Sequence, residues 1–420
     1  MKKVLIITYY WPPSGGAGVQ RWLKFAKFLP EFGWEPVILT VDPEYASYPA
    51  LDYSLDKELP ANTKVFRTPA TDWFKIYSSD KSKVPSAGFA SNADNSWKGK
   101  ISRFIRGNFF LPDPRRGWNR YAFRKACELI NDNKIVTFVT TSPPHSTQLI
   151  GLKLKKKYPG IKWIADLRDP WTDIYYYDQF YPTLISKMID RRYERSVLEK
   201  AGRITTVGFL LKELLSKKLS GIESRIEVIS NGFDEADFTN AERSGQKIFT
   251  ITYVGTLSEK YPLNGFLEAL NILRRSGSDF ILRFVGKVPD KIADRISLNV
   301  PPESLEIIPY SEHSSAISYM VNSSLLLLII PQSGDSRLII TGKIYEYIAS
   351  GRPILCLGPK NGEAANLISR LKIGRCFDYD ETANIEIFIR ETKNNPDSVK
   401  IDPSEFSRRN LTKKLVSVLE

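Results

Sequence analysis

The sequence predicts an α/β protein with two domains, each built on a parallel sheet. Its 420 residues exceed what one hydrophobic core comfortably holds. Short apolar runs, typical of strands buried on both faces, alternate with helical patterns along the chain. This alternation runs in two series, separated by a polar stretch at residues 235–246. We therefore expect domains at 1–240 and 241–400, with a final helix at 401–420.

The first series opens with a buried strand at residues 4–7 and a turn at 12–16. A helix follows, because Val19, Trp22 and Ala26 keep helical spacing, and Gly33 ends it. A strand at 36–41 completes a βαβ unit, the building block of parallel sheets. Later strands are expected at 135–140, 163–166, 204–207 and 226–229, and helices at 146–157 and 184–200.

The second series begins near residue 247. It predicts strands at 249–254, 281–285, 307–308, 325–330 and 354–357, and helices at 263–275 and 342–349. At the C-terminus, Phe406, Leu411, Leu415 and Leu419 share one side of an amphipathic helix. Two such α/β halves form a cleft, and open α/β sheets bind ligands beyond the carboxyl ends of their strands.

Composition narrows the class of protein. The longest apolar run, residues 325–330, is too short for a membrane span, and the N-terminal apolar run lacks a cleavage site for secretion. Cys127, Cys356 and Cys376 are scattered, which argues against a disulfide framework or a metal cluster. These features predict a cytoplasmic protein.

The formal net charge of +13 favours anionic partners. Much of it lies at residues 97–125, where nine basic side chains are interspersed with aromatic and aliphatic ones. This segment is either a surface that faces an acidic membrane or a basic loop that covers part of the first domain. Binding of nucleic acid rests on charge alone, and since no nucleic-acid module is recognisable we do not expect it.

Gly15 and Gly16 lie between the first strand and the first helix, where small residues let an anion approach free backbone N–H groups. They form either a phosphate or substrate loop or a plain tight turn. Arg21 stands where a dinucleotide fingerprint would have its third glycine, which argues against a nicotinamide enzyme.

Polar residues follow two further strands of the first series. His145, one of two histidines, comes directly after a strand, where a neutral imidazole can bond a sugar hydroxyl. Asp166, Arg168 and Asp169 end the next strand. They either bind acceptor hydroxyls or pair with one another to shape the cleft.

The segment 342–354 places Lys343 and Glu346 three residues apart on a short helix, which Gly351 ends. A carboxylate here can bridge the ribose hydroxyls of a nucleotide, as acidic residues do in other Rossmann-type sites. The alternative is an ordinary surface ion pair between the two side chains.

Taken together, these residues resemble glycosyltransferase family 4, whose fold is called GT-B. The resemblance covers nearly the whole chain and rests on the order of its motifs: Gly15-Gly16, the segments 141–145, 166–171 and 229–234, Tyr253-Val254-Gly255, Phe284-Val285-Gly286 and 343–353. It implies two Rossmann-like domains facing each other across a cleft, with the C-terminal helix crossing back onto the first domain.

The resemblance also implies a function. The chain would be a retaining glycosyltransferase that moves a sugar from a UDP- or GDP-linked donor to a glycan or lipid-linked acceptor in surface polysaccharide synthesis, either in the cytoplasm or peripherally on the inner face of the cell membrane. Glu346 would hold the donor ribose, Gly15 and Gly16 would lie against the donor phosphates and acceptor, and His145 would touch the transferred sugar.

Two positions depart from the family pattern. Leu338 replaces the first of two glutamates that the family often has with seven residues between them, and Thr256 replaces an arginine after Gly255. Lys260, Arg337 or Lys343 would then supply the positive charge that stabilises a departing diphosphate. No Asp-x-Asp stands in a convincing metal loop, so neither a metal nor another cofactor is expected. A sugar-nucleotide epimerase or hydrolase of the same fold, and a non-catalytic sugar-nucleotide binder, are the alternatives.

Overall fold

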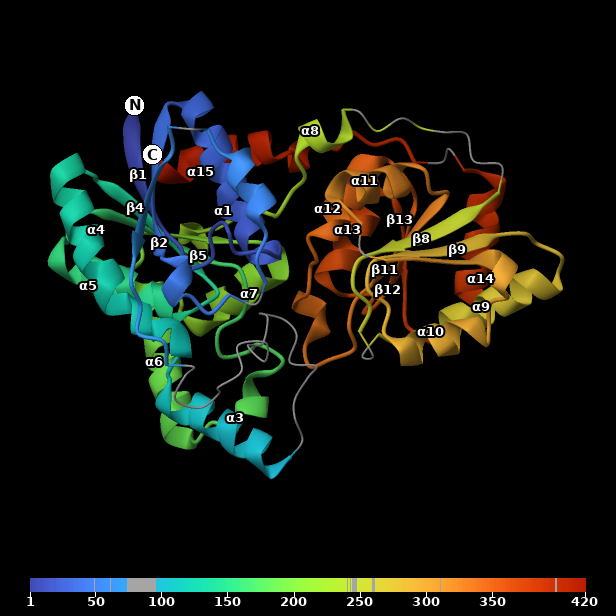
Figure 1. Ribbon diagram of the computed structural model, residues 1–420, viewed down its shortest axis with the longest axis horizontal. Helices are drawn as coiled ribbons and strands as arrows, with labels where there is room; N and C mark the ends of the chain where they lie inside the picture. The colour runs from blue at the N-terminus through green and yellow to red at the C-terminus, as the bar shows by residue number, and fades with distance from the viewer. Residues whose placement is uncertain are drawn as a thin grey trace. The chain divides into compact units, whose positions relative to one another are not determined.

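A computed structural model describes residues 1–48, 50–60, 62–73, 96–239, 241, 243, 248–258, 261–309, 311–396 and 399–420. The chain forms two compact units, one of Met1–Ser230 with Arg408–Glu420 and one of Asn231–Ser407. Each unit contains a parallel sheet with helices packed on it (Figure 1). The predicted class, an α/β protein with two Rossmann-like halves, is confirmed.

The first unit holds a seven-stranded sheet of order β3-β2-β1-β4-β5-β6-β7. Every pairing in it is parallel. The strands are β1 (Lys2–Ile7), β2 (Trp34–Val41), β3 (Lys64–Thr68), β4 (Thr137–Ser142), β5 (Lys162–Leu167), β6 (Arg203–Thr206) and β7 (Ile226–Val228).

The helices of the first unit are α1 (Ala17–Phe28), α3 (Trp97–Phe109), α4 (Asn119–Asn133), α5 (Ser146–Lys157), α6 (Leu184–Lys200), α7 (Phe209–Lys218) and α15 (Arg408–Leu419). Most of them bury an apolar face. In α1, for example, Val19, Trp22 and Ala26 are completely or almost completely buried, as the helical spacing predicts.

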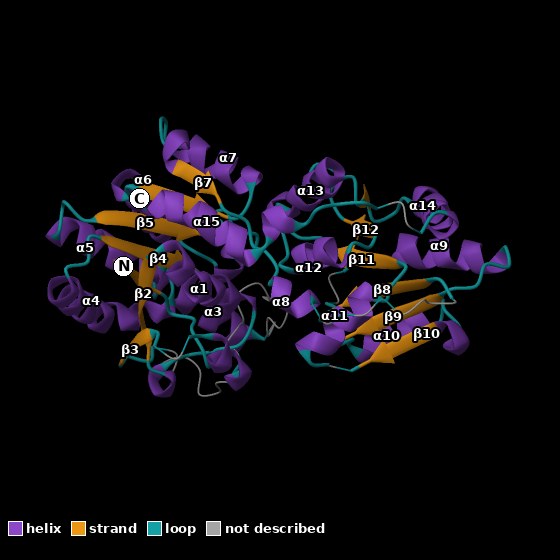
Figure 2. Cartoon of the chain, turned by 90° about the horizontal axis from the view of Figure 1, so that it is seen from above, coloured by secondary structure: helices purple, strands orange, loops and turns teal. Residues whose placement is uncertain are grey.

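The second unit holds a six-stranded parallel sheet of order β10-β9-β8-β11-β12-β13. The strands are β8 (Thr250–Val254), β9 (Ile281–Val285), β10 (Leu305–Ile308), β11 (Leu325–Ile329), β12 (Ile354–Leu357) and β13 (Gly374–Phe377). The helices are α8 (Glu235–Phe238), α9 (Asn264–Arg275), α10 (Asp290–Ser297), α11 (His313–Val321), α12 (Lys343–Ser350), α13 (Glu363–Leu371) and α14 (Thr382–Asn394). Figure 2 distinguishes these strands and helices by colour.

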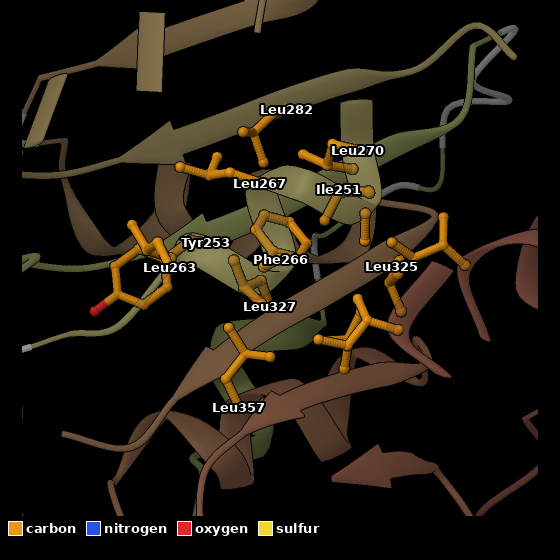
Figure 3. Close-up of a cluster of buried hydrophobic side chains, with 14 of the residues drawn as sticks. Ile251, Tyr253, Leu263, Phe266, Leu267, Leu270, Leu282, Leu325, Leu327 and Leu357 are labelled. Atoms are coloured by element: carbon orange, nitrogen blue, oxygen red, sulfur yellow. The ribbon is translucent and has the colours of Figure 1, made fainter. Parts of the chain in front are cut away.

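A hydrophobic cluster fixes the second sheet against α9. Phe266 and Leu270 of this helix meet Ile251, Leu282 and Leu327 of three strands, and all five are at most 1% exposed (Figure 3). Truncating one such aromatic side chain costs about 3–5 kcal/mol, since a cavity remains. The strand ends beside this core are therefore held rigidly.

The chain passes between the units at positions that differ from those the sequence suggested. Residues 231–234 and 403–407 belong to the second unit, because the Phe233 N–H donates to the Phe406 carbonyl at 3.1 Å and both rings lie in a core cluster of that unit. The helix α15 belongs to the first unit and packs on α1; the red helix lies beside blue elements in Figure 1. Arg409 of α15 pairs with Glu31 at 2.6 Å.

Strand order reverses at one place in each sheet, between β1 and β4 and between β8 and β11. Loops on either side of such a switch point diverge and leave a crevice at the carboxyl edge of the sheet. Gly15 and Gly16 follow β1, and His145 follows β4. Gly255 follows β8, and Lys343 lies beyond β11. Among the described residues, no helix combines the length and apolarity needed to cross a bilayer.

Candidate functional site

In the second unit, Lys343 lies directly against the loop that follows β8. Gly255 has φ of 125°, a backbone conformation that side chains disfavour, and a Cβ atom there would overlap the Nζ and Cε atoms of Lys343. Gly286, after β9, also has φ of 125°, and its Cβ would stand 2.6 Å from the Gly255 carbonyl oxygen. Two glycines thus let two strand ends and a lysine side chain approach closely at the switch point.

The Lys343 side chain is half-buried, and its ammonium has little compensation for the water it has lost. Its Nζ lies 3.4 Å from the Tyr253 hydroxyl and 4.9 Å from the centre of the Tyr253 ring. Burial lowers its pKa to about 8, and the negative charge of Glu346 opposes this shift. The described part of the chain places no carboxylate within salt-bridge distance of this ammonium. A cation in such a setting is prepared to receive an anion.

The other residues predicted to bind the donor differ in their position and exposure. Glu346 is half-buried, one turn along α12 from Lys343. Thr256 is exposed beside Gly255, and its carbonyl accepts from the Tyr253 hydroxyl at 3.0 Å. Lys260 lies outside the described residues.

Arg337 differs from Lys343 in that its charge is already neutralised. Its Nε and Nη2 atoms donate to the two carboxylate oxygens of Asp335 at 2.7 and 2.8 Å. The bidentate pair lies on the surface and lowers the pKa of Asp335. Lys343, rather than Arg337, therefore supplies the uncompensated charge.

The two glycines after β1 have different environments. The Gly15 N–H donates to the Ala50 carbonyl at 2.9 Å, and a Cβ at this position would stand 3.3 Å from that of Asp52. The Gly15 N–H is therefore engaged within the loop rather than free to bind a phosphate. Gly16 is exposed with φ of 92° and precedes α1. Gly16 remains the open position of this loop.

His145 stacks on Trp171 after β4. The two rings lie 4.8 Å apart at an interplanar angle of 13°, and the His145 Nδ1 atom is buried without a hydrogen-bond partner in the described part of the chain. Burial, together with the charges of Lys218 and Arg168, lowers the His145 pKa to about 3. The imidazole is therefore neutral at physiological pH, as a ligand-bonding role requires.

Asp166 is part of the framework rather than an accessible carboxylate. It is completely buried, and its oxygens accept from Trp22 Nε1 at 2.7 Å, Thr141 Oγ1 at 2.7 Å and Thr205 Oγ1 at 2.8 Å. Arg21 adds a salt bridge at 3.1 Å. These partners outweigh the cost of burial and lower the Asp166 pKa. Acceptor binding by Asp166 does not fit this environment, because its oxygens are already engaged.

Arg168 and Asp169 also differ from each other. The Arg168 guanidinium donates to the backbone carbonyls of Ser142, Pro143 and Gly18 at 2.8–3.2 Å, so it ties the loops after β4 and β5 to α1. Asp169 is half-buried and forms no hydrogen bond within the described residues, and burial raises its pKa. Asp169 is thus the open carboxylate of the predicted acid–Arg–acid segment.

Each sheet therefore brings some of the predicted site residues together near its switch point. The second unit brings together Gly255, Thr256, Lys343 and Glu346, and the first brings His145 to the same sheet edge as Asp169.

Two aromatic residues of the site were missed by sequence reasoning. Tyr253 lies under Lys343, and Trp171 orients His145. Both belong to motifs that the sequence had singled out, so an aromatic residue beside a candidate polar group was the available signal.

Comparisons with known proteins identify this architecture. No protein-family model and no curated protein sequence matches the chain. Among solved structures it is similar to a glycosyltransferase from Rickettsia africae, with a TM-score of 0.57 and 14% identity over 100% of this chain and 98% of that one. It is also similar to the Anabaena protein HepE in complex with UDP and glucose, with a TM-score of 0.61 and 11% identity over 100% and 99% of the two chains.

A third structure is a putative UDP-N-acetylglucosamine 2-epimerase from Listeria monocytogenes, with a TM-score of 0.57 and 10% identity over 99% and 95% of the two chains. At these identities the likeness shows the fold. The chain has the two-domain α/β architecture of GT-B glycosyltransferases, and one fold can carry more than one chemistry.

Proposed function

We propose that this chain is a retaining glycosyltransferase that uses a nucleotide-sugar donor. The observation that carries the proposal is the half-buried Lys343 ammonium, which lies against Gly255 at the switch point of the second sheet and forms no salt bridge within the described residues. Nucleotides bind at such points in open α/β sheets, and a diphosphate supplies the negative charge that Lys343 lacks.

Transition-state stabilisation explains why a cation belongs there. When the glycosidic bond of the donor breaks, negative charge grows on the departing diphosphate, and a fixed cation in a water-poor site favours that state. Lys343 takes this role without an obligatory metal, with Lys260 and Arg337 as secondary cations. Glu346, one turn further along α12, accepts from the ribose hydroxyls. Thr256 contacts the diphosphate from the loop after β8.

The first unit supplies the acceptor side. Asp169, with an open carboxylate and a raised pKa, bonds an acceptor hydroxyl, and the neutral His145 bonds the sugar that is transferred. Gly16 leaves room at the loop after β1. A UDP-linked donor is the first choice, since the similar HepE structure holds UDP and glucose, and GDP is the second. A glycan or lipid-linked acceptor of surface polysaccharide synthesis suits the proposed chemistry.

The experiment has two steps. First, thermal stabilisation by UDP, GDP, ADP and their sugars is measured with and without magnesium; a ligand at one hundred times its dissociation constant adds about 2.7 kcal/mol of stability. Stabilisation by one nucleotide family, independent of metal, is expected. Failure of every nucleotide to stabilise the chain would overturn the proposal.

Second, Glu346→Ala is compared with Glu391→Ala, a change in a carboxylate that pairs with Arg375 on the surface of the same unit. We expect Glu346→Ala to weaken donor binding and turnover and Glu391→Ala to leave both unchanged. Release of free sugar or of an epimerised donor at full rate without any acceptor would instead indicate an epimerase or hydrolase. Donor binding without turnover with any acceptor would indicate a non-catalytic binder.

A further inference from the structure

The two halves of the basic segment at residues 97–125 have different environments. Its second half is built into the first unit: Trp118 is 1% exposed and donates to Thr68 Oγ1 at 2.8 Å, and the buried Arg115 donates to the Ser47 carbonyl at 3.5 Å. Its first half is the helix α3, in which no residue is buried. In Figure 1, α3 lies at the lower edge of the first unit.

Large apolar side chains of α3 are exposed to solvent. Trp97 is 67% exposed, Ile101 49% and Phe104 43%, and their spacing of four and three residues puts them on one side of the helix. Phe109, at its end, is 70% exposed. Single exposed apolar residues are ordinary, but four on one short helix indicate a partner.

A second element extends this apolar surface. Leu184, Ile185 and Met188, in the first turns of α6, are 86%, 66% and 64% exposed, and Tyr181 just before them is 45% exposed. We call the exposed side chains of α3 together with those of residues 181–188 the α3–α6 surface. Its aliphatic part from α6 lies outside the basic segment that the sequence had indicated.

Specific contacts join the two elements into one surface. The Asn108 amide oxygen accepts from the Thr183 N–H and the Ser186 hydroxyl, both at 2.8 Å, and its nitrogen donates to the Tyr181 carbonyl at 3.0 Å. The Arg106 guanidinium lies 3.9 Å from the centre of the Phe180 ring. The exposed apolar groups are thus presented by a fixed scaffold.

The charge of this surface selects among partners. The helix α3 carries Lys98, Lys100, Arg103 and Arg106 and no acidic residue, while Lys187 of α6 is paired with Asp178. A second copy of the chain would bring like charges together. Nucleic acid would leave the aliphatic side chains without an apolar environment.

The interface of an anionic bilayer satisfies both components, since it offers hydrocarbon for the apolar side chains and negative headgroups for the cations. We propose that the α3–α6 surface docks the protein peripherally on a bilayer that contains anionic lipid. This goes beyond the proposed function, because none of its residues belongs to the donor or acceptor set.

The test uses the full chain and sedimentation with vesicles of phosphatidylcholine alone or mixed equally with phosphatidylglycerol. The natural sequence is expected to bind the anionic vesicles at least ~10-fold more tightly, and salt should weaken this binding. Two double variants remove one component each: Leu184→Gln with Met188→Gln, and Lys98→Gln with Lys100→Gln. Because all four side chains are exposed, the fold should tolerate both variants, and each should reduce vesicle affinity about tenfold or more.

Matched controls remove the same groups elsewhere. Lys153→Gln with Lys156→Gln takes two exposed lysines from α5, and Leu298→Gln takes a leucine that is 86% exposed in the second unit. Both should bind vesicles as the natural sequence does.

Several outcomes would overturn the proposal: equal loss in controls and test variants, equal binding to both vesicle types, or no binding to either. So would binding of RNA or self-association that only the test variants lose while vesicle binding is unaffected. Thermal stabilisation by nucleotide should be the same in all variants, which separates this surface from the donor site.

Discussion

Asp166, which is fully buried, and Lys343, which is half-buried, are both charged groups near a switch point of their sheet, yet their surroundings are opposite. Asp166 has an arginine, an indole and two hydroxyls within 2.7–3.3 Å. Lys343 has one hydroxyl at 3.4 Å. Accordingly, the pKa of Asp166 is lowered, which favours its charged form, whereas the pKa of Lys343 is lowered to about 8, which disfavours its charged form.

This difference distinguishes a charged residue that holds the fold together from one that is suited to binding a ligand. A buried charge with all its partners stabilises the strand ends around it. A buried charge without them costs stability, and a fold keeps it where a ligand completes the set. The two residues should therefore respond in opposite ways when their charge is removed.

The largest effect is expected from Asp166→Asn. This change leaves the buried Arg21 guanidinium without its counter-charge, and breaking such a pair costs about 3–5 kcal/mol. Thermal unfolding followed by tryptophan fluorescence should show a large fall in the unfolding temperature of the first unit.

The matched variant for this change is Asp169→Asn. It should be neutral or slightly stabilising, because that carboxylate has a raised pKa and no hydrogen-bond partner to lose among the described residues. Equal destabilisation by both variants would mean that the two carboxylates do not differ in role.

Lys343→Met should act in the opposite direction. A fall in pKa from 10.5 to about 8 corresponds to a stability cost on the order of 3 kcal/mol at neutral pH, which methionine removes. The unfolding temperature should rise while nucleotide affinity falls about 10- to 100-fold. Lys360→Met is the control, since that exposed lysine pairs with Glu381. Normal nucleotide binding by Lys343→Met would remove Lys343 from the site.

Gly255→Ala should weaken both stability and nucleotide binding. Its positive φ and the overlap with Lys343 together cost about 2–3 kcal/mol and displace the ammonium. Gly277→Ala separates the two causes, because Gly277 has φ of 77° but no neighbouring atom within 4 Å of the place that an added Cβ would occupy. Only the first variant should lose nucleotide affinity. Equal affinity in both variants would mean that the Lys343 position is unimportant.

His145 is expected to give the smallest effect, visible only in acid. Its pKa is about 3 in the folded chain and about 6.5 when unfolded, so the unfolded state binds more protons between these values. Stability therefore falls as pH drops below about 6.5, by about 2 kcal/mol at pH ~5 from this group. His145→Gln should flatten that part of the curve of unfolding temperature against pH. An unchanged slope would show that the imidazole is not held neutral.

The sequence predicted the fold well, because buried parallel strands leave a plain signal. The runs at residues 4–7 and 325–330 became strands inside their sheets, and the glycines at 255 and 286 stood at strand ends as expected. The site was predicted less well. Asp166, Arg168 and Asp169 share one short segment, but whether a side chain meets Arg21 from a distant helix or remains open is decided by tertiary contacts.

Because tertiary contacts decide which side chains are exposed, the sequence also could not resolve the basic segment at residues 97–125. Composition shows cations and aromatics throughout, but only the structure reveals that Trp118 is a core residue and that Leu184 and Met188, distant in sequence, complete the exposed surface. The structure likewise shows the surroundings of one departure from the family pattern. Leu338 ends a short turn, next to Arg337, whose charge is neutralised by Asp335.

The central claim, that Lys343 awaits the charge of a nucleotide diphosphate, is tested most directly by proton uptake on binding. A bound diphosphate raises the Lys343 pKa above about 8, so at pH ~8 binding should take up about half a proton per site. Isothermal titration calorimetry in two buffers of different ionisation enthalpy measures this number. Uptake by the natural sequence and by Lys360→Met, absent in Lys343→Met, is the predicted result. Binding without proton uptake, or with the same uptake in Lys343→Met, would contradict this role for Lys343.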